Sequence, residues 1–373
     1  MIFNIRANII DDRKCLLRLN EIIKKKLFKK PLIICDKIFK QKNYVKTSLS
    51  KFKFVYYLDF SKEPSYEKLD ETKKKLNKLK QIDCIVAIGG GSCLDFSKGL
   101  ALLMKNSGPS IKYMGFPKKL NQPVPLIAVP TTVSTGSEVV YNAVFTSKKK
   151  KIKLGINTEL NYPKLAILDT KLLSLAPNKL ILRSAIASLM RSIETFTSVH
   201  SNYITRIFAK QSFELLFETI LNFKEKKYEV LNKLQWGCIF SMFALSNSSS
   251  GTCGIINYYL SVNYNIPQPL AYNFTAIEFI KKNLNEGYTN YLDLAGYKVK
   301  NNKNKNLFLI KMDRILQKNT KDIKKAKEIL QKDKDFEKKM FNVFKISKFN
   351  GIKNNPIYLN QKELKKILIK IKS

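Results

Sequence analysis

The chain has 373 residues, 45% of them hydrophobic, which is enough for two domains that each bury a core. No run of about 18 uninterrupted apolar residues occurs, so a membrane-spanning helix is not expected. The first residues, MIFNIRANIIDDRK, lack the order of a secretory signal peptide. The six cysteines show no C-x-x-C spacing, which argues against a zinc knuckle or a disulfide framework and favours a reducing cytoplasm.

The net charge of +39 is the most unusual feature of the composition. Only seven of the 68 basic residues are arginine, and lysine clusters recur along the chain, for example at 24–26, 73–75 and 148–151. A nucleic-acid-binding protein is expected to concentrate its charge beside a recognition motif, and no such motif is present. We therefore interpret the lysines as solvated surface residues. A polyanion-associated protein remains a distant alternative, because such a charge attracts polyanions without specificity.

In chain order, four short apolar runs have the character of buried parallel strands, because each is followed by a turn or polar residue. The segment between the first two has apolar residues at helical spacing over 66–79. Strand, helix and strand in this order predict a parallel α/β sheet. The four expected strands are 31–36, 84–90, 123–130 and 165–169.

After Pro177 the pattern changes to helical periodicity, over 180–223, 231–246, 270–285 and 359–371. The only histidine, His200, falls in a turn and is expected to be a solvated or capping residue. We predict a nucleotide-binding α/β domain at 1–178 and a helical domain at 179–373. The predicted fold class is thus an N-terminal Rossmann-like parallel α/β domain followed by an all-α domain.

Two glycine- and hydroxyl-rich segments follow predicted strands. Gly89-Gly90-Gly91-Ser92 lies between a strand and a helix expected to begin near Leu94. Glycines at such a turn let the backbone approach a pyrophosphate, whose charge is met by free N–H groups at the helix start. The segment 130–138, PTTVSTGSE, places hydroxyls at the carboxyl end of the next strand, where open α/β sheets bind ligands. Together they predict a nucleotide site.

These segments resemble signatures of the iron-containing alcohol dehydrogenases. GGGSCLDFSK (89–98) is similar to the family's GGGSxxDxAK, and PTTVSTGSE to its PTTxGTGSE. YPKLAILD (162–169) and NNPIYLNQKEL (354–364) match further family segments in the right order, so the resemblance covers nearly the whole chain. It implies the dehydroquinate synthase-like fold and aldehyde–alcohol interconversion with a nicotinamide cofactor. DFSKGL and YNIPQPLA are similar to the branch that reduces phosphonoacetaldehyde.

Carried over residue by residue, the resemblance implies a set of cofactor contacts. Asp36 would bond the adenosine ribose, and a carboxylate there repels a 2′-phosphate, so NAD is expected in preference to NADP. Asp36 could equally be a turn residue that ends its strand. Lys153 matches the family lysine beside the nicotinamide half. The remaining implied contacts are Gly89, Gly90, Gly91, Ser92 and Asp95 around the pyrophosphate, with Thr131, Thr132 and Thr135 along the cofactor.

The family's metal is held by one aspartate and three histidines, and this chain lacks them. Ala187 and Arg191 stand in place of the aspartate and the first histidine, while Glu194 of the same segment is retained. Two registers are open for the other positions: one places Gly254 and Gln268 there, the other Asn257 and Ala271. Neither contains a histidine, and asparagine and glutamine are poor ligands for iron or zinc. We therefore expect no metal.

Two functional interpretations remain open. In the first, the protein is an oxidoreductase in which Arg191 stabilises the developing alkoxide and Gln268 or Asn257 orients the carbonyl. A small aldehyde or alcohol, with an anionic group that suits Arg191, would be the substrate. In the second, it is a pseudoenzyme that binds nucleotide or protein partners. No specific nucleic acid and no membrane are expected, and the resemblance implies association into a homodimer.

Overall fold

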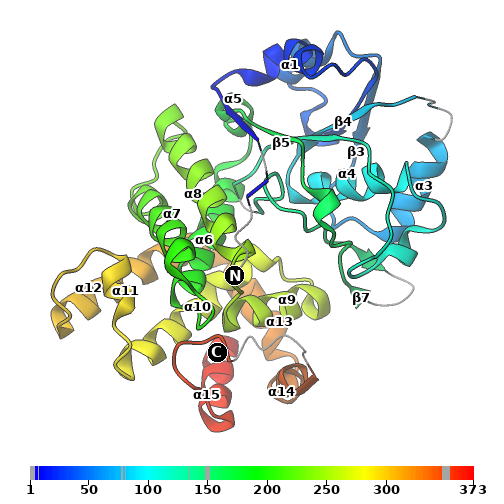
Figure 1. The fold of residues 1–373 in the computed structure, drawn as a ribbon. Coiled ribbons are helices and arrows are strands. Elements are labelled where there is room, and N and C mark those ends of the chain that lie inside the picture. The colour runs from blue at the N-terminus through cyan, green and yellow to red at the C-terminus, as the bar shows by residue number, and fades with distance from the viewer. Residues whose placement is uncertain are drawn as a thin grey trace. The chain divides into compact units, whose positions relative to one another are not determined.

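The computed structural model describes residues 5–6, 8–76, 79, 81–133, 135–147, 152–346 and 353–373. Ser134 of the threonine-rich segment and the lysine cluster at 148–151 lie outside the described residues. The chain divides into two compact units after Pro177 (Figure 1). The α/β unit comprises Ile5–Pro177 with Lys226–Asn232, and the helical unit comprises Asn178–Glu225 with Lys233–Ser373.

The α/β unit is built on a parallel sheet, which confirms the predicted fold class. In the described part of the chain this sheet has six strands in the order β1-β8-β5-β4-β2-β3. The four predicted strands are all present, whereas the two edge strands were not predicted. The strands are β1 (Ile9–Asp11), β2 (Pro31–Asp36), β3 (Phe54–Leu58), β4 (Cys84–Gly89), β5 (Leu126–Pro130) and β8 (Leu165–Leu168).

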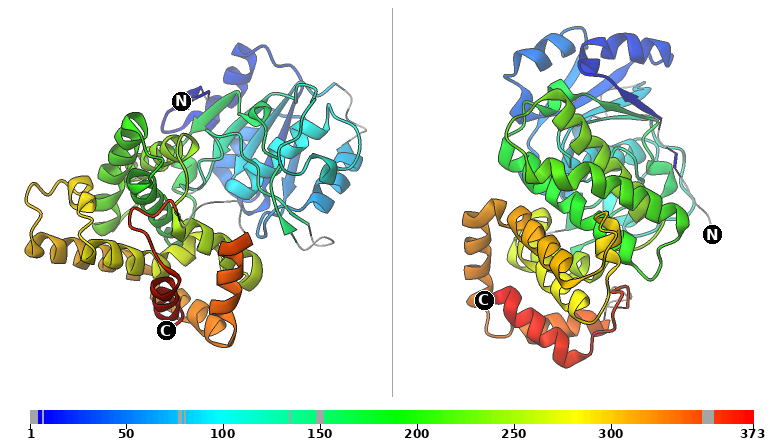
Figure 2. Two further views of the ribbon diagram at one scale, coloured as in Figure 1. Left: turned by 60° about the horizontal axis from the view of Figure 1, so that its bottom comes forward. Right: turned by 90° about the vertical axis from the view of Figure 1, so that its left-hand side faces the viewer.

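Both faces of the sheet are apolar because the central strands are apolar at every position before Asp36, the last residue of β2. Leu32 and Ile34 of β2 face one core, and Ile33 and Cys35 face the other. The first core is covered by α3 (Tyr66–Leu76) and α4 (Gly91–Leu103), and the second by α1 (Leu19–Lys25) and α2 (Asn43–Leu49). Helices thus flank the sheet on both sides (Figure 2), as in other parallel α/β sheets.

The helical unit confirms the periodicity read after Pro177, with one interruption. The stretch 180–223 forms two helices, α6 and α7, because Asn202 and Thr205 make a capping box that starts a new helix. His200 lies in the turn between them and is exposed, as expected. The helices are α6 (Asn178–Thr197), α7 (Tyr203–Leu221), α8 (Tyr228–Ser246), α9 (Thr252–Tyr264), α10 (Gln268–Asn285), α11 (Asn290–Leu294), α12 (Asn302–Leu316), α13 (Thr320–Gln331), α14 (Phe336–Ile346) and α15 (Gln361–Lys372).

Two further features of the described residues concern membrane-spanning helices and the cysteines. No helix within them is long and apolar enough to cross a lipid bilayer. The six cysteines are free thiols, and each is buried. Burial raises the pKa of the Cys35 thiol to about 12, so this group is protonated and unreactive at neutral pH.

Candidate functional site

The order of the strands places a ligand-binding edge between β2 and β4. From β2 the chain passes to β3 on one side and then to β4 on the other, so the direction of winding reverses between β2 and β4. Open α/β sheets bind ligands at the carboxyl ends of strands beside such a reversal. The register pairs Cys35 with Ile88 and Gly89 with Pro130. Asp36 and the first residues of the two signature segments therefore lie at the same height along this edge of the sheet.

The glycine turn and the threonine-rich segment lie against each other at this edge. α4 begins at Gly91 rather than near Leu94, with Gly90 as its N-cap, so the signature itself supplies the free N–H groups of the helix start. A Cβ built on Gly90 would lie 3.3 Å from Cγ2 of Thr132, and one on Gly91 would lie 2.3 Å from Cγ2 of Thr135. Glycine is therefore required where the two segments meet, and the exposed backbone forms a cradle suited to a phosphate.

Gly91→Ala is expected to weaken NADH binding about tenfold without lowering the free energy of unfolding. The added methyl group would push Thr135 away from the turn, while alanine is a better helix former than glycine. Isothermal titration calorimetry and urea unfolding measure the two quantities. Gly99→Ala is the matched control: its Cβ would meet Phe145 in the core at 2.6 Å, so it should lower stability by about 1–3 kcal/mol. Unchanged NADH affinity in Gly91→Ala would contradict the cradle.

A buried hydrogen-bond network around Lys98 holds the segment that follows the threonines. The Lys98 ammonium group donates to Oγ of Ser137 at 2.7 Å and to the carbonyl oxygens of Val140 and Asn142 at 2.7 and 2.8 Å. Ser137 in turn donates to Asp95 at 2.6 Å. Burial lowers the pKa of Lys98 to about 8 and raises that of Asp95. Lys98 was not singled out from the sequence, although its charge on an otherwise apolar helix face was a usable signal.

The expected cofactor residues differ in how free their side chains are. Both oxygens of Asp95 are engaged, since the second accepts from the Val144 N–H at 3.0 Å. Asp36 ends β2 and accepts from the Ile38 N–H at 3.2 Å, and burial raises its pKa. Lys153 is largely buried and ion-paired with Glu63. Asp95 and Lys153 are therefore committed to contacts within the α/β unit, whereas Asp36 keeps one carboxyl oxygen for a hydroxyl group.

In the helical unit, α6 presents Arg191 and Glu194 one turn apart. Arg191 Nη1 donates to Oγ of Ser241 at 3.2 Å. Glu194 accepts from the Gly254 N–H and from the Tyr272 hydroxyl, both at 3.0 Å. Burial raises the pKa of Glu194, and these two hydrogen bonds together with the positive charge of Arg191 oppose the rise. Sequence reasoning did not identify Ser241 or Tyr272.

The residues at the family's metal-ligand positions do not fit a divalent metal. Ala187 has no donor atom, and the guanidinium group of Arg191 repels a cation. A Cβ on Gly254 would lie 1.9 Å from Oγ of Ser250, so a longer side chain fits there only if Ser250 moves. Asn257 is buried and bonded to Thr275, and Gln268 is the first residue of α10. Within the described ranges, no group of three or more His, Cys, Asp or Glu is arranged to hold a metal ion.

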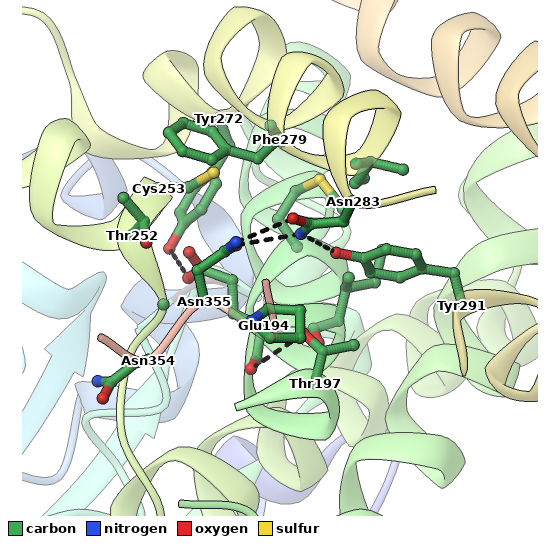
Figure 3. Close-up of a pocket in the computed structure, with 16 residues that line it drawn as sticks. Glu194, Thr197, Thr252, Cys253, Tyr272, Phe279, Asn283, Tyr291, Asn354 and Asn355 are labelled. Carbon is green, nitrogen blue, oxygen red and sulfur yellow. Dashed lines mark hydrogen bonds between the residues drawn. The ribbon is translucent and has the colours of Figure 1, made fainter. Parts of the chain in front are cut away.

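A cavity of about 30 Å³ lies beside Glu194 (Figure 3). This volume accommodates about two water molecules, which is too little for a carbonyl substrate together with its surroundings. Asn283 and Asn355 exchange amide hydrogen bonds of 3.0 and 2.9 Å across it, and Asn283 also donates to the Tyr291 hydroxyl. This network ties the C-terminal segment to α10, so its asparagines have a structural role.

Comparisons with known proteins identify the family of the chain. Residues 7–170 match the family model described as iron-containing alcohol dehydrogenase, and residues 182–371 match the C-terminal model of the same family. The chain is 29% identical to 4-hydroxybutyrate dehydrogenase of Clostridium kluyveri over 55% of its own length and 56% of that protein. It is 28% identical to sulfoacetaldehyde reductase of Bilophila wadsworthia over 59% and 57%. The chain thus spans little more than half the length of these curated relatives.

Solved structures show the same fold. The chain superposes on sulfoacetaldehyde reductase from Bifidobacterium kashiwanohense, solved in complex with NAD+, with a TM-score of 0.81, at 21% identity and over 100% and 99% of the two chains. An alcohol dehydrogenase from Oenococcus oeni gives a TM-score of 0.84, at 22% identity and over 99% of both chains. Since the two family models together match almost all of the sequence, the chain belongs to the iron-containing alcohol dehydrogenase family.

Proposed function

We propose that the protein interconverts an aldehyde and an alcohol with a nicotinamide cofactor. The observation that carries this proposal is the cradle formed by the glycine turn and the threonine-rich segment at the reversal of the sheet. NAD is preferred over NADP because Asp36 lies at the same edge. We assign cofactor binding to residues 1–178 and the reacting carbonyl to residues 179–373. The cofactor contacts are Asp36, Gly89, Gly90, Gly91, Ser92, Thr131, Thr132 and Thr135, with Asp95 and Lys153 holding the surrounding segments.

The nicotinamide, when bound, supplies or accepts the hydride. Arg191 performs the role that falls to the metal in relatives: its permanent positive charge stabilises the negative charge that develops on the substrate oxygen. Ser241 fixes the orientation of the guanidinium group. Gln268, or Asn257 in the other register, donates an amide N–H to the same oxygen. No step passes through a metal ion, since the residues at the ligand positions do not fit one.

The substrate we propose is a small aldehyde that carries an anionic group. Two relatives are named for small anionic substrates, the alcohol 4-hydroxybutyrate and the aldehyde sulfoacetaldehyde. The net charge of +39 favours the approach of anions. The free, buried thiols support a reducing cytoplasmic location.

Calorimetric titration with NADH and NADPH, with the metal content measured on the same sample, tests the proposal. We expect micromolar NADH affinity that is independent of metal and at least about tenfold tighter than NADPH affinity, because Asp36 repels a 2′-phosphate. Asp36→Ser should narrow this preference while leaving the fold intact. If neither nucleotide binds, the signature segments serve only as turns of the fold, and the proposal is wrong.

The replacement of all four ligand positions also favours a second candidate, a pseudoenzyme that binds nucleotide without catalysis. The two candidates differ in turnover. A panel of short aldehydes, with phosphonoacetaldehyde and sulfoacetaldehyde included, would be followed by NADH absorbance. NADH binding without turnover of any aldehyde would favour the pseudoenzyme.

A further inference from the structure

A groove of about 700 Å³ lies on the helical unit, where α10 and α12 pack against each other (Figure 1). It is lined by Lys281 of α10 and by residues 309–318, from α12 and the helical turn Gln317–Asn319 that follows it. Binding sites for small molecules usually enclose about 300–1,000 Å³. Among the described residues that line the groove, none is assigned above to the cofactor or to the reacting carbonyl.

Three cationic side chains line this groove: Lys281, Arg314 and Lys318. Arg314 and Lys318 are four residues apart, a spacing at which like charges on a helix face each other and repel. Burial, together with the charge of Arg314, lowers the pKa of Lys318. Asp313 is the one carboxylate among the described lining residues. The groove therefore carries an excess of positive charge that an anion would neutralise.

The groove also has an apolar wall, formed by Leu309 and Ile310 of α12. Leu309 is half-buried, whereas Ile310 is 65% exposed. A ligand that covers Ile310 would remove apolar surface from water, which favours binding. The groove thus suits a molecule that is anionic at one end and apolar at the other.

Arg314 differs from the other arginines of the chain in its contacts. Only seven of the 68 basic residues are arginine, and each of the other six has a partner. Within the described ranges, the side chain of Arg314 makes no hydrogen bond, ion pair or ring contact. Its guanidinium group, whose planar donors match the oxygens of a phosphate, is therefore available to a ligand. The other six pairs are Arg6 with Glu159, Arg13 with the ring of Tyr228, Arg18 with Asp12, Arg183 with Asp322, Arg191 with Ser241, and Arg206 with Ser201.

We propose that this groove binds an organic phosphate, whose phosphate group contacts Arg314 and Lys318 and whose apolar part lies against Ile310. A phosphate monoester carries a charge of about −1.5 to −2 at neutral pH and has three acceptor oxygens. It can therefore accept from a guanidinium and an ammonium group at once, which a carboxylate with two oxygens and one charge does less well. Gln317 lines the groove between the two cations in sequence and supplies an uncharged donor.

Isothermal titration of the full chain with phenyl phosphate tests the charged end of the groove. Arg314→Ala with Lys318→Ala should weaken binding at least about tenfold, because two charge-assisted hydrogen bonds are lost. Lys324→Ala with Lys325→Ala is the matched control: it removes the same charge from exposed positions of α13 and should change the affinity by no more than about twofold. Circular dichroism verifies that each variant is folded. Equal losses in the two double variants would show that the net charge attracts the phosphate, and the proposal would be wrong.

Two single variants test the remaining contacts, and neither result can be produced by binding at the glycine cradle. Asp313→Asn should tighten phenyl phosphate binding about two- to tenfold, because it removes the carboxylate that repels the phosphate. Ile310→Ala should weaken phenyl phosphate binding about three- to tenfold and leave inorganic phosphate binding unchanged, because only the ester has an apolar part. Unchanged affinity for phenyl phosphate in both variants would contradict the assignment of the groove.

The phosphate could belong to a soluble metabolite or to a lipid headgroup, and sedimentation with vesicles of phosphatidylcholine and phosphatidic acid distinguishes the two. Binding of phenyl phosphate without a loss of sedimentation in Arg314→Ala with Lys318→Ala would identify a soluble phosphate. Sedimentation that this variant loses and the α13 control retains would identify a lipid phosphate. If the wild type binds neither phenyl phosphate nor the vesicles, the groove is not a phosphate site.

Discussion

Replacing Lys98 by methionine is expected to lower the free energy of unfolding by about 3–5 kcal/mol, because each of the three buried acceptors left without a donor costs about 1–3 kcal/mol. The variant removes the donor to Ser137, Val140 and Asn142, and it removes the positive charge near the buried Asp95. Because these residues continue the threonine-rich segment, NADH affinity should fall as well. Urea unfolding followed by circular dichroism, together with calorimetry, measures both effects.

The exposed Lys105, which follows the same helix, provides the control. Lys105→Met should change the free energy of unfolding by no more than about 0.5 kcal/mol, as is usual for surface substitutions. A similarly small change in Lys98→Met would show that the hydrogen bonds of Lys98 do not hold the segment.

Lys98 also makes the free energy of unfolding depend on pH, in a direction that follows from its pKa. The pKa of Lys98 is about 8 in the folded protein, against 10.5 for a solvated lysine, because burial disfavours the charged form. Between these two values the unfolded chain binds more protons than the folded one, so stability rises with pH. The cost of burying the charge is fully present below pH 8 and is lost as pH approaches 10.5. The difference in unfolding free energy between wild type and Lys98→Met should therefore grow over this window.

The sequence predicted the centre of the sheet well and its edges poorly, for a physical reason. β4, β5 and β8 are buried throughout and β2 is buried after Pro31, so their residues form apolar runs that are broken only by Asp36 at the end of β2. β1 has only three residues, which is too short a run to indicate a strand. The apolar run of β3, Phe54–Leu58, was a usable signal that the sequence analysis missed, although every residue of this edge strand is only half buried. The reversal between β2 and β4 follows from pairing between distant segments, which no local pattern encodes.

At the site, too, local sequence patterns were predictable, whereas contacts between distant segments were not. The glycine and threonine segments were recognisable because their residue types reflect a local need for close backbone approach. Their mutual contact at Gly91 and Thr135, and the hydrogen bonds of Lys98 that support it, depend on the alignment of β4 and β5. The amide pair between Asn283 and Asn355 joins residues 72 positions apart and has no signature in either segment.

Arg191→Ala is expected to lower kcat for the best aldehyde by about 100- to 1,000-fold, the usual effect of removing one group that stabilises an oxyanion. NADH affinity should stay within about twofold, because Arg191 belongs to the helical unit and the cofactor residues to the α/β unit. Arg191→Lys should recover only part of the rate, since an ammonium group lacks the planar geometry that bonds Ser241 and the substrate oxygen together.

Arg183→Ala is the matched control, because Arg183 lies on the same helix but pairs with Asp322. It should leave kcat close to the wild-type value. Loss of Arg191 also removes the positive charge that opposes protonation of Glu194, so burial should raise the pKa of that carboxyl further. An unchanged kcat in Arg191→Ala would mean that this arginine only fills the space left by the metal ligands. Stabilisation of the substrate oxygen would then have to come from an uncharged donor such as Gln268 or Asn257.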